Sequence, residues 1–191
     1  LADEAEPVRD VSYRASQVLV GQFGTSQTSL LLPPLEEGFF HGDWRIRQSS
    51  IQLMGTVIEN LLKEHRQFGA DLMSCEVLTK ERRAFMLSSL YMVRSDENHT
   101  VAQTAAVTWK TLVSNTPKTL RELLPILMKR IVSNLSSKSE EKKVIAGRCM
   151  GDLVAKLGEK LMAELMPILM NSLKSENALM RHGVCVGMAE L

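Results

Sequence analysis

The segments ELLPILMK (122–129) and ELMPILMN (164–171) are near-copies of each other, and each places a proline within the apolar spacing of an amphipathic helix. Proline in a helix interior removes one backbone hydrogen bond, clashes with the carbonyl group four residues earlier and costs about 3 kcal/mol. The two copies lie 42 residues apart, and LLPPLEEG (31–38) precedes them as a third relative. A costly residue that recurs at this spacing predicts a structural repeat.

A second helical pattern follows each proline segment, in residues 43–62, 97–113, 139–158 and 177–191. In the first three copies, residues of one helical face recur at offsets of three and seven: Ser50, Leu53 and Val57; Ala105, Thr108 and Leu112; Ala146, Cys149 and Leu153. Gly55 and Gly151 lie five residues beyond the small position. In the fourth copy His182 and Gly187 take these places, so we expect a shift in its register. Glycine within a helix costs about 1 kcal/mol relative to alanine, so its recurrence predicts close helix packing.

Paired helical patterns without sustained period-two alternation predict an all-α fold, an α-solenoid of about four to five antiparallel helix pairs. We treat residues 1–191 as one solenoid segment, which we expect to be excised from a longer chain. Its first helices are expected at 29–40, 82–94, 119–135 and 159–173. The expected units are 1–28 (partial), 29–65, 82–115, 118–158 and 159–191, with a non-periodic insertion loop at 63–81.

The charge balance and the missing catalytic motifs restrict the function of the chain. Lys and Arg total 23 against 22 Asp and Glu, so the net charge of +1 gives no general attraction to nucleic acid or anionic membrane. No apolar run approaches the roughly 18 residues of a membrane span. No HExxH, phosphate-binding loop or nucleophile elbow occurs. We therefore predict neither an enzyme nor a metal, cofactor or small-molecule site. The scattered cysteines predict reduced core thiols, in the cytosol or the nucleus, and we expect a cytoplasmic protein.

Three features together resemble HEAT repeats over nearly the whole chain: a proline within the first helix, Asp-x-x-Ile-Arg at the start of the second, and a later Met-Gly pair. The resemblance implies first helices that are bent at three prolines, Pro34, Pro125 and Pro167. It also implies a ladder of aspartate and arginine along the stack, at Asp43 and Arg47. We expect an incomplete ladder, because Lys143 and Ala102 replace the arginine in two units and Arg181 is slightly out of register.

Longer strings, at 30–55, 114–128 and 151–169, resemble the general-control translational activators, a family of very large ribosome-associated HEAT proteins. The resemblance is to the central region of these proteins. It implies a non-catalytic scaffold segment that promotes activation of the initiation-factor-two-alpha kinase under amino-acid starvation. The implied partners are the ribosome, through RNA phosphates or ribosomal proteins, and, through the full-length protein, the kinase and an ATP-binding-cassette cofactor.

Clusters of basic residues are the candidate partner-binding sites. They are Lys80, Arg82, Arg83, Lys118, Arg121, Lys129, Arg130, Lys138, Lys142 and Lys143. Stacking of the repeats is expected to align several of them along one edge, which would suit RNA phosphates or acidic protein tails. The simpler interpretation is an ordinary solvated surface, since Glu81, Glu122, Glu140 and Glu141 are interleaved. Aromatic residues for base stacking are absent nearby, so base reading is not expected.

Two other classes of helical-repeat protein remain as alternatives. Nuclear-transport receptors and phosphatase scaffolds share the fold but bind protein partners on the concave face. The length of the full chain would distinguish them, because the activators are several times larger. A HEAT-like alkylbase glycosylase would need a strongly basic, aromatic-lined concavity with a carboxylate. Two tryptophans in a near-neutral chain argue against that enzyme.

Overall fold

The computed structural model describes residues 1–64 and 78–191, apart from the side chains of residues 159 and 160. These residues form nine α-helices, one short 3₁₀ helix (η3, Val93–Ser95) and no strand. The helices are α1 (Glu6–Phe23), α2 (Thr28–Gly38), α3 (Trp44–Glu64), α4 (Lys80–Met92), α5 (His99–Leu112), α6 (Thr116–Leu135), α7 (Glu140–Leu157), α8 (Glu159–Leu173) and α9 (Ala178–Met188). The described helices confirm the predicted all-α solenoid.

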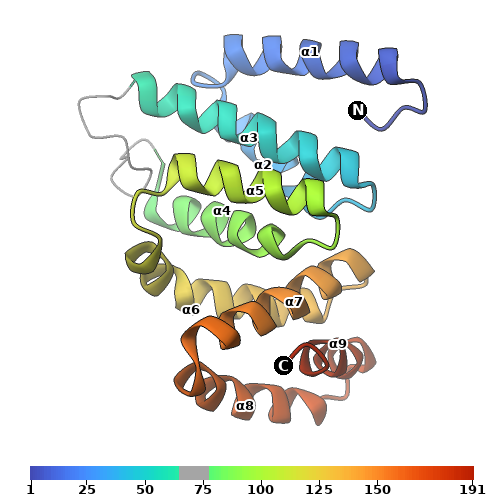
Figure 1. Ribbon diagram of the computed structural model, residues 1–191, viewed down its shortest axis with the longest axis vertical. Helices are drawn as coiled ribbons and strands as arrows, with labels where there is room; N and C mark the ends of the chain where they lie inside the picture. Colours follow the sequence, from blue (N-terminus) through green and yellow to red (C-terminus); the bar gives the residue numbers. More distant parts are fainter. Residues whose placement is uncertain (65–77) are drawn as a thin grey trace.

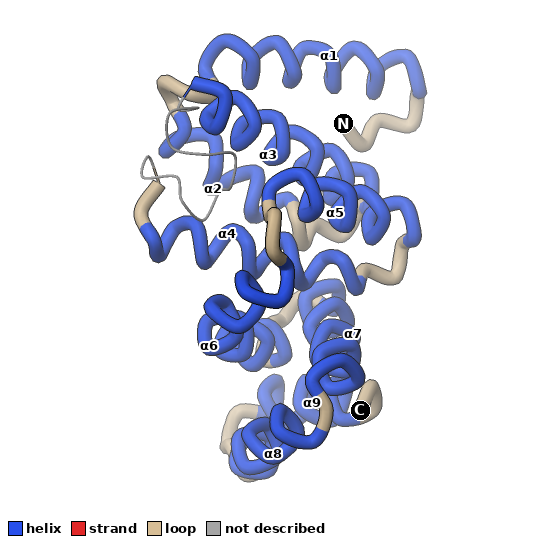
Figure 2. Tube along the Cα trace, turned by 60° about the vertical axis from the view of Figure 1, so that its left-hand side comes forward, coloured by secondary structure: helices blue, strands red, loops and turns tan. Residues whose placement is uncertain are grey.

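The helices form two layers along the long axis of the molecule (Figures 1 and 2). One layer contains α2, α4, α6 and α8, and the other contains α3, α5, α7 and α9, with α1 packed against α3. The core lies between the layers, where apolar residues such as Ile51, Leu123 and Val184 are fully buried. Every helix from α2 to α9 begins and ends within three residues of its predicted position. The division into repeat units stays a prediction.

The two ends of the predicted insertion loop at 63–81 are helical. Helix α3 continues to Glu64, and α4 begins at Lys80 because the side chain of Thr79 accepts a hydrogen bond from the backbone N–H of Arg82. The prediction of a loop was therefore wrong at these ends. The middle of the insertion, 65–77, lies outside the described residues.

All three repeat prolines lie inside unbroken helices and on their exposed side. Because proline has no N–H, the carbonyl group four residues earlier loses its partner. The residues that carry these carbonyls are also exposed: Leu30, Arg121 and Ala163. Water can therefore bond the orphaned carbonyl groups, which lowers the cost of each proline. The bends at these positions stay a prediction.

Side-chain caps define a common register for the second-layer helices. The cap oxygens belong to Asp43, Asn98, Ser139 and Asn177. In this register Gly55 and Gly151 lie twelve residues after the cap, but Gly187 lies ten residues after it. Val184, not His182, therefore matches the small position of the other copies, so the register of the fourth copy shifts by two residues.

The recurring glycines do lie at close contacts between helices, as predicted. A Cβ atom at Gly55 would lie 3.1 Å from a side-chain carbon of Thr108 on α5, and one at Gly151 would overlap the carbonyl oxygen of Glu190. Gly183, which the sequence did not single out, is tighter still, since a Cβ atom there would overlap the carbonyl oxygen of Leu135 at the end of α6. These glycines let neighbouring backbones approach.

The stacking changes between α5 and α7. Helices α3 and α5 pack along each other, whereas α7 packs against η3 and the end of α4. Figures 1 and 2 show α7 running obliquely to α5. The second layer is therefore continuous from α1 to α5 and opens at this joint.

Candidate functional site

The guanidinium group of Arg47 ties its own helix pair to the next one. Its Nε donates to Oδ2 of Asp96 at 2.8 Å and its Nη2 to Oδ1 at 3.0 Å, and both side chains are buried. Its Nη1 donates to the backbone carbonyl groups of His41 and Gly42. Asp43, the predicted acid of the ladder, instead caps the start of α3. Arg47 therefore links neighbouring helix pairs, but its acidic partner is Asp96 and not Asp43. A ladder along the whole stack stays a prediction.

Two further arginines bind the bend that precedes their own helix in the same way. Nη1 of Arg181 donates to the carbonyl groups of Ser175 and Glu176, six and five residues earlier, as Arg47 does with its own bend. Arg181 is therefore in register, contrary to prediction. Nη1 of Arg9 makes the same pair of contacts with residues 3 and 4. A basic residue four positions after the cap was the signal that could have revealed Arg9.

Lys143 replaces the arginine in α7 and is also structural. Its side chain is almost completely buried, with Nζ bonded to the carboxylate of Glu140 and 3.2 Å from Nδ1 of His182 on α9. An ammonium group at this depth cannot contact a partner. The prediction of Lys143 as a partner-binding residue is therefore wrong.

The other predicted cations do not share one edge. Lys80 is the first residue of α4 and Lys118 lies in the first turn of α6, while Lys138 follows the far end of α6. Because α4 and α6 lie side by side in one layer, these residues mark opposite ends of it (Figure 1). Four lysines are exposed and make no ion pair with a described residue: Lys80, Lys118, Lys129 and Lys138. The guanidinium group of Arg83, in contrast, donates to the carbonyl of Leu78.

Arg82, Arg130 and Lys142 come together in a groove of about 360 Å³ lined by residues of α2, α4, α6 and α7. Nη2 of Arg82 lies 3.0 Å from a carboxylate oxygen of Glu36, which is 6% exposed. The guanidinium group of Arg130 lies 3.6 Å from the ring centroid of Phe85. The structure thus joins three of the predicted cations around a buried acid that the sequence reasoning did not identify.

Burial outweighs ion pairing in this groove. Desolvation raises the pKa of Glu36, although the charges of Arg82 and Arg130 oppose that shift. Desolvation likewise lowers the pKa of Arg130 against the opposing charge of Glu36. The arginines are therefore partly committed to an internal carboxylate, and the four exposed lysines, none of which lines this groove, are the cations available to an external anion.

The described residues contain no catalytic arrangement that we can identify. Burial raises the pKa of the Cys149 thiol to about 12, which keeps it protonated and unreactive near neutral pH. Among residues 1–64 and 78–191, no group of His, Cys, Asp and Glu side chains could hold a metal ion. None of the helices in these ranges has the length and apolar character needed to cross a membrane.

Comparison with known proteins gives a consistent result. No family model and no solved structure matches the chain. All of the chain is 39% identical to the eIF-2-alpha kinase activator GCN1 of Dictyostelium discoideum, 42% identical to the stalled ribosome sensor GCN1 of Homo sapiens and 36% identical to the eIF-2-alpha kinase activator GCN1 of Saccharomyces cerevisiae. The chain spans about 8% of the length of each of these relatives. The whole chain therefore matches one segment of proteins named GCN1.

Proposed function

We propose that the chain is a non-catalytic scaffold segment of a cytoplasmic, ribosome-binding translational activator that promotes activation of the initiation-factor-two-alpha kinase. The observation that carries the proposal is the similarity of the whole chain to proteins named as activators of this kinase and as sensors of stalled ribosomes. A solenoid supports such a role because it holds distant binding surfaces at fixed spacing while each repeat contacts only its neighbours.

The exposed lysines of the α4–α6 layer are the proposed contact with the ribosome. Lys80, Lys118, Lys129 and Lys138 are exposed and make no ion pair with a described residue, so an approaching phosphate displaces only water and counterions. The kinase and the ATP-binding-cassette cofactor would engage the full-length protein. This segment would contribute to the spacing between them and the ribosome.

The test is charge reversal in the full-length protein. One variant changes Lys80, Lys118, Lys129 and Lys138 to Glu. We expect ribosome cosedimentation to weaken by roughly tenfold or more. The slope of log affinity against log salt should become shallower by about 0.7–0.9 for each phosphate that the variant no longer binds. Phosphorylation of initiation factor two alpha in starved cells should fall as ribosome binding weakens.

The matched control reverses four exposed cations that lie outside α4, α6 and the α6–α7 bend: Arg14, Lys63, Lys110 and Lys174. Both variants change the net charge equally, so a general electrostatic effect would weaken both. Cosedimentation of the first variant at the wild-type level, or equal weakening of both, would show that the α4–α6 lysines do not contact the ribosome.

A further inference from the structure

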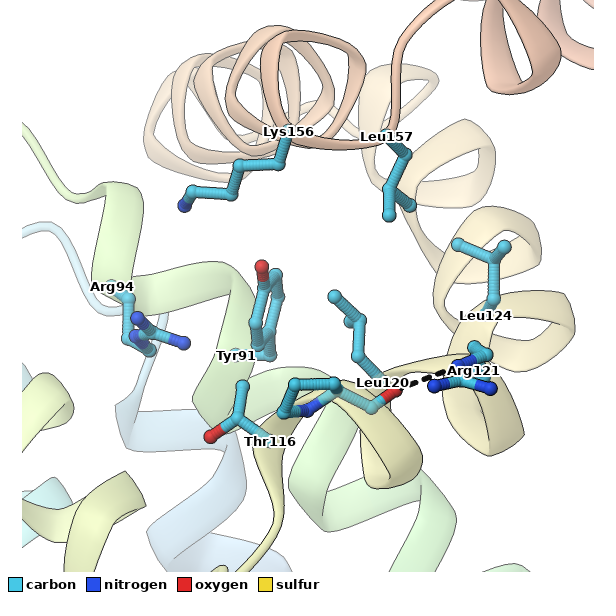
Figure 3. A pocket seen from close by; sticks show the side chains of 9 residues that line it. Tyr91, Arg94, Thr116, Leu120, Arg121, Leu124, Lys156 and Leu157 are labelled. Carbon is cyan, nitrogen blue, oxygen red and sulfur yellow. Dashed lines mark hydrogen bonds between the residues drawn. The ribbon is translucent and has the colours of Figure 1, made fainter.

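A second cavity, of about 350 Å³, opens where α4, α6 and α7 meet (Figure 3). Its lining residues come from four elements: Tyr91, Arg94, Thr116, Pro117, Leu120, Arg121, Leu124, Lys156 and Leu157. It lies at the joint where α7 leaves α5 and packs against η3 and α4. Of these residues, only Arg121 was among the cations predicted from the sequence.

One wall of the cavity is apolar. Figure 3 shows the side chains of Leu120, Leu124 and Leu157 on one side of it, with the ring of Tyr91 between them and Arg94. Leu157 is 39% exposed, which leaves a large apolar side chain at the mouth of the cavity. Covering such a surface with an apolar side chain of a ligand is favourable, at about 25 cal/mol for each Å² removed from water.

Three cations also line the cavity. Arg94 and the end of Lys156 lie away from the leucines, whereas Arg121 lies beside Leu124 (Figure 3). No acidic residue is among the described residues that line the cavity. Nε and Nη1 of Arg94 are buried and have no hydrogen-bond partner in the described part of the chain. Its guanidinium group instead lies 4.8 Å from the ring centroid of Tyr91. Buried donors without partners are unfavourable, so a carboxylate that reached them would be held strongly.

The aromatic rings of this region are not placed for nucleic-acid bases. Tyr91 is 3% exposed and packs edge-on against Trp109, with ring centroids 5.2 Å apart. Arg94 lies over the rings of both residues. Stacking of bases requires an accessible ring face, whereas this cavity offers leucines beside three cations.

We propose that this cavity binds a short acidic peptide segment of a partner protein. A leucine or phenylalanine side chain of that segment would enter between Leu120, Leu124 and Leu157. Its neighbouring carboxylates would bind Arg94, Arg121 and Lys156. The charge complementarity and the apolar wall together select this occupant over a lone anion, which would leave the leucines uncovered. This site does not depend on the ribosome-binding surface, because none of the four exposed lysines lines it.

The experiment selects peptides with the full-length protein from a display library of random twelve-residue peptides. The expected result is enrichment of peptides that combine Asp or Glu with Leu or Phe. Selected peptides are then labelled with fluorescein, and their affinities are measured by fluorescence anisotropy. Arg121→Glu and Leu157→Ser should each weaken binding roughly fivefold or more, as expected for a rim charge and an apolar anchor. Both positions are exposed, so both variants should fold, and circular dichroism checks this.

The matched control is Lys129→Glu, which makes the same charge change as a reversal at Arg121 on the same helix but outside the cavity. It should leave peptide affinity within twofold of the wild-type value, as expected for a distant surface charge. The proposal is overturned if no acidic-apolar peptides are enriched, or if Arg121→Glu and Leu157→Ser bind them like wild type. It is also overturned if oligouridine RNA binds the wild type and loses affinity in these variants while peptides do not.

Discussion

Replacing Asp96 with asparagine would test the tie between consecutive helix pairs. The change keeps the size of the side chain and an oxygen that can accept from the backbone N–H of Asn98, at 2.8 Å in the wild type. It removes the charge that faces the Arg47 guanidinium group, whose side chain is 9% exposed. Breaking a buried ion pair in this way costs about 3–5 kcal/mol. Because the amide oxygen can still accept one N–H group, we expect a loss of about 3 kcal/mol in the free energy of unfolding.

The assay is urea unfolding followed by circular dichroism at 222 nm. Its control is Glu97→Gln, which removes the exposed ion pair between Glu97 and Arg148, whose atoms are 3.6 Å apart. That variant should lose less than about 1 kcal/mol. Adding Arg47→Met to Asp96→Asn should cost less than the sum of the single changes, because the second change removes the unpaired charge. Equal losses from Asp96→Asn and Glu97→Gln would refute the proposed role of the pair.

Two further predictions concern the packing of α9 and the buried thiol. Gly183→Ala should lower the free energy of unfolding by about 1–3 kcal/mol in urea titrations, because the new methyl group meets the Leu135 carbonyl. Gly21→Ala should not lower it, because a Cβ atom at Gly21 would have no neighbouring atom within 4 Å. Iodoacetamide at pH 8 should modify exposed Cys185 in peptide maps and spare Cys149, since a pKa of about 12 leaves roughly one thiol in ten thousand ionised. Because folding raises the pKa of the Cys149 thiol from 9.0, the contribution of this thiol to stability should be lost as pH rises from about 9 to 12. Rapid modification of Cys149 in the folded protein would contradict the predicted protection of its thiol.

The positions of the helices could be predicted because they depend on local signals. Apolar spacing defined each helix, and Asn98, Ser139 and Asn177 capped the second-layer helices where polar residues suggested bends. Helix α6 shows the limit of this reasoning. It begins at Thr116, three residues before the predicted start, because Asn115 caps it and Pro117 fits a first turn, where its missing N–H has no cost.

The partners of charged residues could not be predicted in the same way. Arg47 lies 49 residues from Asp96, and the choice between Asp43 and Asp96 depends on how two pairs stack. Lys143 reads as a surface lysine in sequence, but its neighbour His182 comes from a later helix. Periodicity assigns a residue to a face of its helix. It does not assign the residue on another helix that covers that face.

The cavity beside Tyr91 was missed for a related reason. Arg94, Arg121 and Lys156 belong to different elements, and none of them is unusual in its local sequence. They converge only because α7 packs against η3 instead of along α5. The cavity therefore depends on the angle at which α7 packs after α5.

That joint also has a mechanical consequence. A rod built from nearest-neighbour contacts bends more easily where two helices of a layer make few contacts, and in the second layer that place is between α5 and α7. Straightening or curving the rod would move Lys156 and Leu157 relative to Tyr91 and Leu120, so the shape of the cavity would change with the curvature of the rod. A peptide bound there would act as a wedge, and tension along the solenoid would alter the affinity of the wedge in return.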